Sequence, residues 1–283
     1  MKRQSELISC AEITLESAGV PRPRWTAEQL LSNRLDCEPV ELYVEPPSIS
    51  PEQAVGFQAD VAARVGGVPL QYLQGTASFY GREFWVGPGV FIPRPETEIL
   101  VEVALDLLSV CPEPGDFSPV VVDVGAGSGA IAVTLGLEIP GLPIFGIEKS
   151  SVALSFARRN AGRLGCRVPF LQGDLVSMLL PGSADLIVAN LPYLDPTTAA
   201  AWPPELAWEP WLALDGGNRG LALIETLIEG AYSLLRPRGR LLLEIGSEQA
   251  DAVCSFARLH SFVVERVVGD LAGAERVVVL WKN

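Results

Sequence analysis

The first 70 residues space their hydrophobic positions as amphipathic helices do. Leu7, Ala11 and Leu15 recur at four-residue intervals, which brings their side chains to one face of a helix. No group of residues in this region carries a recognisable chemistry. Short helices with modest apolar faces typically form a packing or docking module, so we predict a helical docking domain over residues 1–70.

Two polar pairs mark helix starts within this region. Thr26 with Gln29, and Ser50 with Gln53, have the spacing of a capping box, in which two side chains satisfy free amides of the first turn. Pro51 supports the second start, because proline fits the first helical position. The sequence therefore predicts helices that begin near residues 26 and 50.

The pattern changes beyond residue 70. Residues 71–95 hold two aromatic-rich arms around Gly81, which predicts a β-hairpin and linker. From residue 96 onward, short apolar runs alternate with helical periods, and two final apolar runs are joined by a glycine-containing loop. The predicted strands are 120–124, 143–147, 168–171, 185–190 and 240–245, and the predicted helices are 100–108, 129–138, 151–164 and 220–235. This alternation predicts an α/β fold with a doubly wound, mostly parallel, seven-stranded sheet over residues 96–283, closed by an antiparallel pair.

Composition narrows the class of protein. Hydrophobic residues make up 48% of the 283 residues, which is ample for a packed core, yet no apolar run approaches the ~20 residues of a membrane span. Acidic residues at Glu6 and Glu12 interrupt the N-terminal segment, so we expect an amphipathic helix there and not a signal peptide. The net charge of −13 weighs against a general nucleic-acid binder.

The cysteines and the histidine argue against a metal site. The five cysteines are scattered and form no Cys-x-x-Cys pair, which predicts free thiols in a reducing cytoplasm. His260 is the only histidine, and its neighbours place it near a helix end. We therefore expect no bound metal and a cytoplasmic protein.

A glycine-rich loop joins the first predicted strand of the sheet to the following helix. Glu148 ends the second strand, where its carboxylate is placed to accept hydrogen bonds from a ribose diol. The loop reads Gly125, Ala126, Gly127, Ser128 and Gly129. This spacing fits both a dinucleotide fingerprint and the loop of S-adenosylmethionine (SAM) methyltransferases, and the alternation of three glycines after Asp123 favours SAM. A third interpretation is a glycine loop that binds nothing.

Polar side chains follow four successive predicted strands. Asp123, Glu148, Asp174 and Asn190 all lie at carboxyl ends, the edge at which open α/β sheets bind ligands. Asp174 is placed to meet an adenine amino group. We therefore predict that these residues line one crevice.

Asn190, Leu191, Pro192 and Tyr193 end a buried strand with an amide, a rigid turn and an aromatic ring. The side-chain oxygen of Asn190 and the carbonyl of Leu191 can both accept hydrogen bonds from a substrate –NH₂ group. They would aim a planar nitrogen at a methyl donor and stabilise the positive charge that forms on it. Tyr193 would supply a flat wall against the substrate.

The chain resembles the HemK-type protein-(glutamine-N5) methyltransferases, which modify peptide chain release factors. The resemblance covers roughly residues 68–280 and rests on "IPRPETE", "DVGAGSGAIAV", "NLPY", "EPWLALDGG", "EIGSEQ" and "GDLAGAERVVV". It implies that residues 125–129, Glu148, Asp174, Leu175, Asn190 and Phe91 contact SAM, and that residues 190–193 also hold the glutamine of a Gly-Gly-Gln motif. It also implies that the N-terminal helices dock the release factor.

Two positions depart from the family pattern. Leu191 stands where the family has a second proline, and Glu148 stands where it usually has aspartate. Asn-Leu-Pro-Tyr also resembles the adenine dimethyltransferases of ribosomal RNA, so an adenine-N6 methyltransferase is the alternative. A nicotinamide-dependent oxidoreductase and a non-catalytic protein that binds release factors are further alternatives.

Overall fold

The computed structural model describes residues 4–109 and 118–283, so Cys111 lies outside the described residues. The chain divides into two compact units, which are considered separately. The first unit runs to Thr76 and also takes in Pro203–Trp208, and the second comprises Ala77–Trp202 and Glu209–Asn283. The sequence analysis divided the chain at residues 70 and 95 into a docking domain, a hairpin with linker, and a wound-sheet domain. These boundaries remain predictions.

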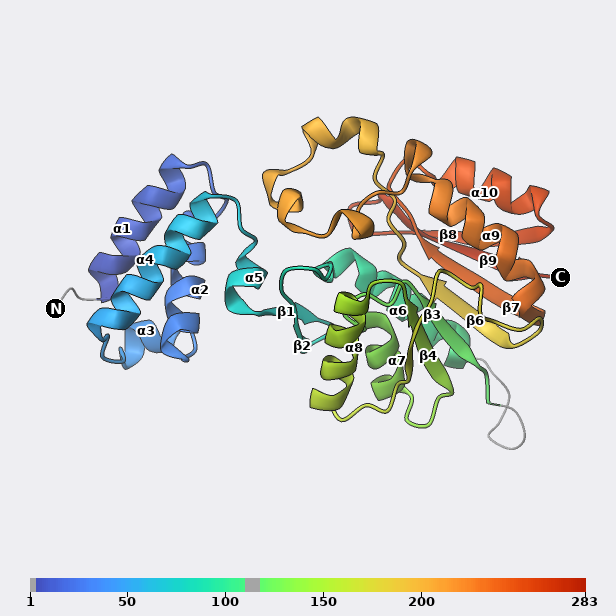
Figure 1. Ribbon diagram of the computed structural model, residues 1–283, viewed down its shortest axis with the longest axis horizontal. Helices are drawn as coiled ribbons and strands as arrows, with labels where there is room; N and C mark the ends of the chain where they lie inside the picture. Colours follow the sequence, from blue (N-terminus) through green and yellow to red (C-terminus); the bar gives the residue numbers. More distant parts are fainter. Residues whose placement is uncertain (1–3, 110–117) are drawn as a thin grey trace. The chain divides into compact units, whose positions relative to one another are not determined.

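The first unit is helical (Figure 1). Its helices are α1 Gln4–Ser17, α2 Pro23–Leu35, α3 Glu41–Val44, α4 Pro51–Val65 and α5 Leu70–Gln74. Leu15, Leu31 and Phe57 from three of these helices are among the buried residues of its core. The apolar stripe read from the sequence therefore forms a small, separate core.

One predicted helix start is confirmed and the other is wrong. Ser50 and Gln53 form a complete capping box at the start of α4. Helix α2, however, begins at Pro23, so Thr26 lies inside it and its hydroxyl donates to the Pro21 carbonyl at 3.3 Å. Proline fixes the backbone angle that a first helical turn requires, and this outweighs the side-chain pattern.

The second unit is a wound sheet preceded by a small hairpin (Figure 1). The hairpin strands are β1 Thr76–Phe79 and β2 Arg82–Trp85, and the sheet strands are β3 Val121–Val124, β4 Ile144–Glu148, β5 Phe170–Gln172, β6 Ala184–Ala189, β7 Leu235–Glu244, β8 Phe262–Gly269 and β9 Glu275–Lys282. The α-helices are α6 Glu98–Ser109, α7 Ala130–Glu138, α8 Ser151–Arg163, α9 Ala222–Leu234 and α10 Ala250–Leu259. Short 3₁₀ turns of this unit are η1 Pro95–Thr97, η2 Pro196–Ala201, η4 Trp211–Ala213 and η5 Asn218–Gly220, whereas η3 Pro204–Trp208 belongs to the first unit.

The sheet has the predicted topology. Its strand order is β5-β4-β3-β6-β7-β9-β8, with the first five strands parallel and β9 antiparallel to both β7 and β8. Helix α10 was not among the predicted helices, because its buried face consists mainly of small residues such as Ala250 and Ala257. His260 directly follows α10, as predicted.

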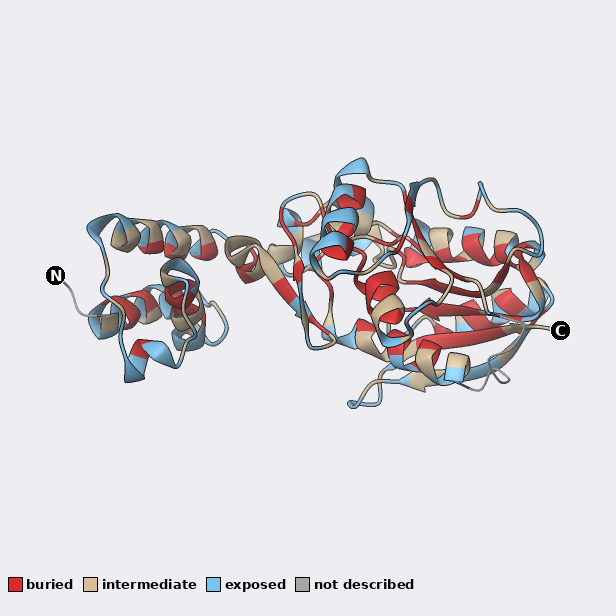
Figure 2. Cartoon of the chain, turned by 90° about the horizontal axis from the view of Figure 1, so that it is seen from below, coloured by how far each residue is buried: buried red, intermediate tan, exposed pale blue. Residues whose placement is uncertain are grey.

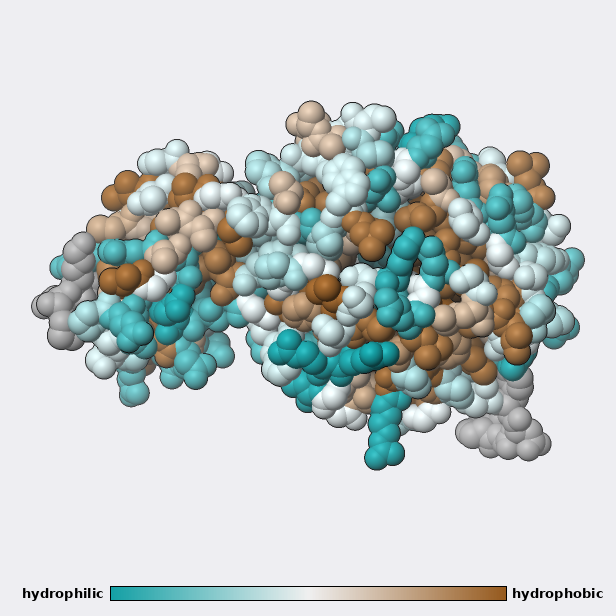
Figure 3. All heavy atoms as spheres, in the orientation of Figure 1, coloured by the Kyte–Doolittle hydropathy of each residue, from teal (hydrophilic) through white to brown (hydrophobic). Residues whose placement is uncertain are grey.

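Two cores cover the sheet. Buried residues follow the strands and the inner faces of the helices (Figure 2), and Val122 and Val188 lie in different cores because they face opposite sides of the sheet. Polar and apolar side chains share the outer surface of both units on the face drawn in Figure 3. Along the described part of the chain, no helix is both long and apolar enough to cross a membrane. The same residues contain no cluster of three or more His, Cys, Asp or Glu side chains suited to a metal ion.

Candidate active site

The parallel register brings the predicted motifs to one edge of the sheet. Val124, the last residue of β3, pairs with Ile147 on one side and with Ala189 on the other. Ala189 in turn pairs with Leu243. The residues that follow these strands, including the glycine loop, Asn190 and Glu244, therefore begin side by side.

The glycines of the loop serve two different purposes. A Cβ atom on Gly129 would come within 3.0 Å of the Phe170 ring and 3.2 Å of Ala157, so glycine lets α8 pack closely against the loop. A Cβ on Gly127 would meet only the Gly125 carbonyl oxygen, at 3.9 Å, and otherwise enter open space. Gly127 also has φ of +56°, which favours glycine. The space in front of Gly127 is available to a ligand.

Most loop amides are used within the protein. The amides of Gly125 and Ala126 donate to the Ile147 carbonyl at 2.9 and 3.0 Å, and the Gly129 amide donates to Ala126 at 2.7 Å. The Gly127 amide donates to Glu148 Oε2 at 2.8 Å. A pyrophosphate cradle needs such amides free to face its anionic oxygens. The loop is thus built for close approach of a ligand and not for binding phosphate.

Glu148 braces the loop from the end of β4. Its Oε1 atom accepts from the Ser150 amide at 2.7 Å, while Oε2 holds Gly127. The residue is 9% exposed, so little of the carboxylate faces water. Each carboxylate oxygen has a second acceptor site, so Glu148 can still accept hydrogen bonds from a diol.

Asn160 holds the loop from the side of α8. Its side-chain amide donates to the Ser128 carbonyl at 2.9 Å and to the Trp85 carbonyl at 3.1 Å, and its oxygen accepts from the Trp85 amide at 2.7 Å. Asn160 is fully buried. The hairpin, α8 and the glycine loop are therefore joined through one side chain.

The four polar residues predicted to line the crevice do not all do so. Asp123 is fully buried, and its carboxylate accepts from the Ala132 amide in the first turn of α7 at 3.1 Å. Burial raises its pKa to about 7. Asp123 thus anchors a helix start, while Asp174 is exposed and pairs with Lys149 at 2.8 Å. The neighbouring Leu175 has φ of +48°, a left-handed conformation that costs a residue other than glycine about 1–3 kcal/mol. Residues strained in this way are found most often at functional sites.

Asn190 has a fixed partner. Its side-chain nitrogen donates to Thr97 Oγ1 at 2.9 Å, and Thr97, at the end of η1, is 4% exposed. Because the nitrogen faces Thr97, the amide oxygen of Asn190 points away from Thr97. It is the acceptor that the sequence analysis assigned to a substrate –NH₂ group.

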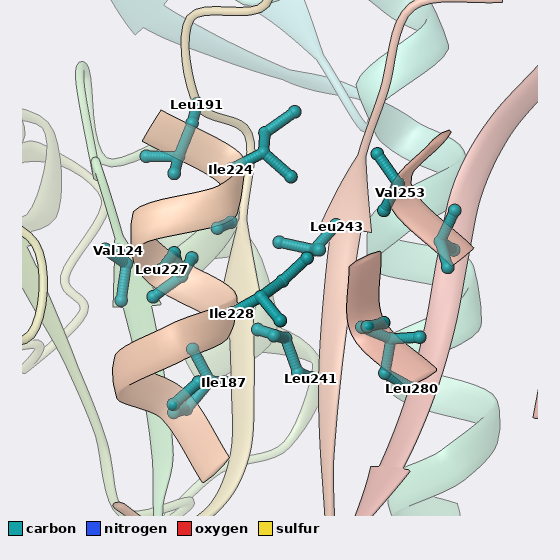
Figure 4. Packing of buried hydrophobic residues seen from close by; sticks show 14 of the residues in the cluster. Val124, Ile187, Leu191, Ile224, Leu227, Ile228, Leu241, Leu243, Val253 and Leu280 are labelled. Atoms are coloured by element: carbon teal, nitrogen blue, oxygen red, sulfur yellow. The ribbon is translucent and has the colours of Figure 1, made fainter. Parts of the chain in front are cut away.

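Leu191 faces inward. It is 3% exposed, belongs to the core that contains Ile224 and Leu227, and lies near Ile224 in Figure 4. A Cβ on Gly125 would come within 2.9 Å of the Leu191 side chain. The residue that departs from the family pattern therefore packs directly against the glycine loop.

The backbone of the Asn-Leu-Pro-Tyr turn is held by a distant segment. A Cβ on Gly216 would lie 2.6 Å from the Pro192 carbonyl oxygen, and a Cβ on Gly220 would lie 2.0 Å from that of Tyr193. Gln249 donates to the same Tyr193 carbonyl at 3.0 Å. Only glycine permits these close backbone contacts, and Gly216 is the first glycine of the "DGG" in "EPWLALDGG".

Tyr193 and Glu244 meet behind this turn. The Tyr193 hydroxyl donates to Glu244 Oε1 at 3.4 Å, and Glu244 Oε2 is buried without a hydrogen-bond partner among the described residues. Burial raises the pKa of Glu244 to about 7, although the neighbouring hydroxyl groups of Thr97 and Tyr193 act to lower it. Burial, together with the charge of Glu244, also raises the pKa of Tyr193, so its hydroxyl remains a donor.

The "IPRPETE" segment is fixed by a buried acid. Glu209 accepts from the Ile92 amide at 3.0 Å and forms an ion pair with Arg94. The Arg94 guanidinium in turn lies 4.8 Å from the centre of the Phe91 ring. Glu209 thereby sets the position of Phe91 and of the turn that carries Thr97.

Known proteins resemble both units. The family profile described as the PrmC N-terminal domain matches residues 6–75, and the methyltransferase small domain matches residues 87–202. A release factor glutamine methyltransferase from Koribacter versatilis is 39% identical over 94% of this chain and 93% of its own. Another, from Moorella thermoacetica, is 39% identical over 95% of each chain. The chain belongs to the release factor glutamine methyltransferase family.

A solved structure supports the fold of this family member. A methyltransferase from Pyrococcus furiosus superposes with a TM-score of 0.54 at 15% identity, over 80% of this chain and 98% of its own. The family and the fold are those of class I SAM-dependent methyltransferases, and this chain is an enzyme of that kind. The open space before Gly127, beside the Glu148 carboxylate, fits SAM, which carries a ribose diol and no phosphate.

The structure adds residues to the site of this methyltransferase that the sequence analysis did not single out. They are Thr97, Asn160, Glu209, Glu244 and Gln249. Four of them lie within or beside segments that carried the family resemblance, but their sequence gives no sign of their partners. For Asn160, the sequence indicated only that it lies on an amphipathic helix, and nothing in it pointed to a role in the site.

Proposed function

We propose that this methyltransferase transfers a methyl group from SAM to the side-chain amide nitrogen of the glutamine in the Gly-Gly-Gln motif of peptide chain release factors. The observation that carries the proposal is the hydrogen bond from the Asn190 nitrogen to Thr97. It leaves the Asn190 oxygen as an acceptor at the edge of the sheet where the glycine loop also lies. The names of the relatives supply the substrate class.

The residues proposed to hold SAM surround the end of β3 and β4. Residues 125–129 would lie along it, Glu148 would accept hydrogen bonds from its ribose hydroxyls, and Asp174, Leu175 and Phe91 would border its adenine and neighbouring groups. SAM supplies an electrophilic methyl group on a positively charged sulfur. Its methyl group needs an uncharged, well-aimed nitrogen as acceptor.

Residues 190–193 would present that nitrogen. An amide nitrogen is a poor nucleophile because its lone pair is delocalised into the carbonyl group. The Asn190 oxygen and the Leu191 carbonyl would each accept one N–H of the glutamine amide, which fixes its orientation and stabilises the positive charge developing on nitrogen. Orientation of this kind can supply up to ~7–11 kcal/mol, and preorganised dipoles add to it. The Pro192 ring and the close backbone contacts of Tyr193 keep both acceptors in place.

The first unit is proposed to recognise the release factor. It exposes large apolar side chains, including Trp25 at 46%, Val44 at 72% and Val55 at 65%. Exposed aromatic and aliphatic groups of this kind are typical of protein-binding surfaces. We expect Trp25→Ala to raise the KM for an intact release factor and to leave the KM for a short glutamine peptide unchanged.

A mass-spectrometric assay tests the proposed reaction. The chain is incubated with SAM and a release factor, with the same factor carrying alanine in place of the motif glutamine, or with ribosomal RNA. We expect one added methyl group on the glutamine and none on the other two substrates. Methylation of the RNA alone would establish the adenine-N6 alternative. We also expect the enzyme to work in the cytoplasm, without metal.

A further inference from the structure

Two tryptophans of the second unit form an aromatic surface between β6 and α9, in the segment drawn in yellow to orange in Figure 1. The rings of Trp202 and Trp211 stack with their centroids 5.4 Å apart and their planes inclined by 28°. Trp211 is 52% exposed, and the adjacent Leu212 is 51% exposed. We call these three residues the tryptophan surface. Large aromatic side chains are enriched at surfaces that recognise other molecules.

The two indole rings are held in fixed positions. Trp202 donates its indole N–H to Thr198 Oγ1 at 3.0 Å, and Trp211 donates its indole N–H to Asp215 Oδ2 at 3.0 Å. Because the one polar group of Trp211 is bonded and one ring face is stacked on Trp202, the exposed part of this side chain is mainly apolar ring. A flat ring that is already ordered loses little conformational freedom when a ligand packs on it.

Trp211 lies between two anchors that reach the proposed active site. Glu209, two residues earlier, accepts from the Ile92 amide at 3.0 Å, beside the Phe91 that is proposed to border SAM. Two residues span at most about 7 Å, so Trp211 lies close to this anchor. Asp215, four residues later, is the second anchor, because it bonds to the Trp211 indole.

The second anchor is joined to the substrate turn. Asp215 forms a β-bridge with Leu194, the residue that directly follows Tyr193. The Gly216 amide donates to the Leu194 carbonyl at 2.9 Å, and a Cβ on Gly216 would lie 2.6 Å from the Pro192 carbonyl oxygen. The tryptophan surface therefore adjoins the turn that is proposed to hold the glutamine.

The charge around the tryptophan surface favours a peptide over a nucleic acid. Residues 194–217 contain no Lys, Arg or His, whereas Asp195 and Asp215 flank the two tryptophans. Hydrogen bonds from Thr197 lower the pKa of Asp195, which keeps it ionised at neutral pH. Bases also stack on tryptophan, but these carboxylates repel the phosphates of a strand, and the uncharged main chain of a peptide meets no such repulsion.

We propose that the tryptophan surface, through the open side of the Trp211 ring, binds the main chain of the two glycines that precede the target glutamine. The proposal rests on the proposed function, because it extends the glutamine site along the substrate chain. Glycine has no side chain, so its peptide planes lie flat against a ring, whereas a Cβ atom holds the chain away from it. Trp211 thus contributes to the selection of Gly-Gly-Gln and takes no part in methyl transfer.

Trp211→Ala tests the contact directly. We expect the KM of a short Gly-Gly-Gln peptide to rise about 10- to 30-fold, the loss typical of a tryptophan at the centre of an interface, with little change in kcat. SAM affinity measured by calorimetry should be unchanged, and Trp211→Phe, which keeps a flat ring, should retain most of the peptide affinity. Trp25→Ala is the matched control: it removes a tryptophan of similar exposure from the first unit and should leave the peptide KM unchanged. An unchanged peptide KM in Trp211→Ala would overturn the proposal.

A change in the peptide separates direct contact from a general disturbance of the segment. The wild type should bind an Ala-Ala-Gln peptide about tenfold more weakly than Gly-Gly-Gln, because the added methyl groups meet the ring. Trp211→Ala should bind the two peptides equally. Equal discrimination by both proteins would overturn the proposal, because the preference for glycine would then arise elsewhere.

Calorimetry with S-adenosylhomocysteine in place of SAM measures peptide binding without methyl transfer. Peptide binding that depends on Trp211, with no methylation of the glutamine once SAM is supplied, would refute the proposed function alone. Methylation of a release factor, with wild-type peptide binding in Trp211→Ala, would refute this proposal alone. Binding of an RNA strand that is tighter than that of the peptide and is lost in Trp211→Ala would overturn it in favour of base stacking.

Discussion

The two halves of the proposed active site are supported in different ways. On the cofactor side, the glycine loop is braced mainly by the next elements along the chain, through Glu148 at the end of β4 and Asn160 on α8. On the substrate side, Asn190 and Tyr193 depend on Thr97, Gly220 and other residues from distant segments. The first half is held mainly within one continuous stretch of the chain from β3 to α8, whereas the second brings together segments that are far apart in sequence.

The sharpest way to separate the two halves is Asn190→Ala. Loss of one preorganised polar contact typically costs ~10²–10³ in kcat, and no SAM contact of the glycine loop is altered. We expect single-turnover methylation of a release factor to fall by that factor, while SAM affinity in a titration stays within a few-fold. Near-normal turnover would show that this amide does not orient the substrate.

Gly220→Ala tests the distant support of the substrate half. The new methyl group would lie 2.0 Å from the Tyr193 carbonyl oxygen, so the turn must move. A shift of about 1 Å can cost ~10² in rate, and we expect that loss in kcat with SAM affinity retained. Gly141→Ala is the matched control, because Gly141 also has positive φ but a Cβ there meets nothing within 4 Å. Equal effects of both changes would point to backbone strain alone.

Glu148→Ala tests the cofactor half. It removes the brace of Gly127 together with the proposed ribose contacts, and charge-assisted hydrogen bonds are typically worth ~1.5–3 kcal/mol. SAM should bind roughly ten- to a hundredfold more weakly, and kcat at saturating SAM should change less. Glu148→Asp restores the usual family residue and should recover most of the affinity. An unchanged dissociation constant in Glu148→Ala would exclude this carboxylate as a ligand.

The contrast between the halves explains what could be predicted from sequence. Hydrophobic periodicity and the glycine spacing sufficed for the wound sheet and for the loop, because both depend on residues within one or two elements. The link from Thr97 to Asn190 joins positions that are 93 residues apart, and no local pattern encodes it. Asp123 shows the opposite case. Its place near the carboxyl end of a strand was predicted correctly, but its side chain bonds to the start of α7 and does not line the crevice.

Glu244→Gln should raise the free energy of unfolding at neutral pH. Folding raises the pKa of this carboxyl from an ordinary value of 4.5 to about 7, so the folded state favours the protonated form. The stability that this group contributes is full below pH 4.5 and is lost as the pH rises through 7. The neutral amide avoids that loss. The free energy of unfolding of the variant should therefore exceed that of the wild type by up to about 3 kcal/mol at pH 8, and the two should be equal near pH 4. Urea unfolding at the two pH values measures the difference. Equal stability of the two proteins at pH 8 would contradict a raised pKa of the buried Glu244 carboxyl group.

The smallest expected effect comes from Leu191→Pro, which restores the usual family residue at the junction of the two halves. Proline keeps the carbonyl that is proposed to accept the substrate N–H, so activity on glutamine should be retained or increased. The Leu191 side chain, however, is 3% exposed and lies against Gly125, and a shorter ring cannot fill the same space. Removing about one buried methylene costs roughly 1 kcal/mol, so we expect a small decrease in stability with little change in methylation. Unfolding curves and single-turnover assays on the same preparation would separate the two outcomes. Loss of glutamine methylation, with RNA methylated by the wild type, would favour the adenine-N6 alternative, since the leucine would then serve a different substrate.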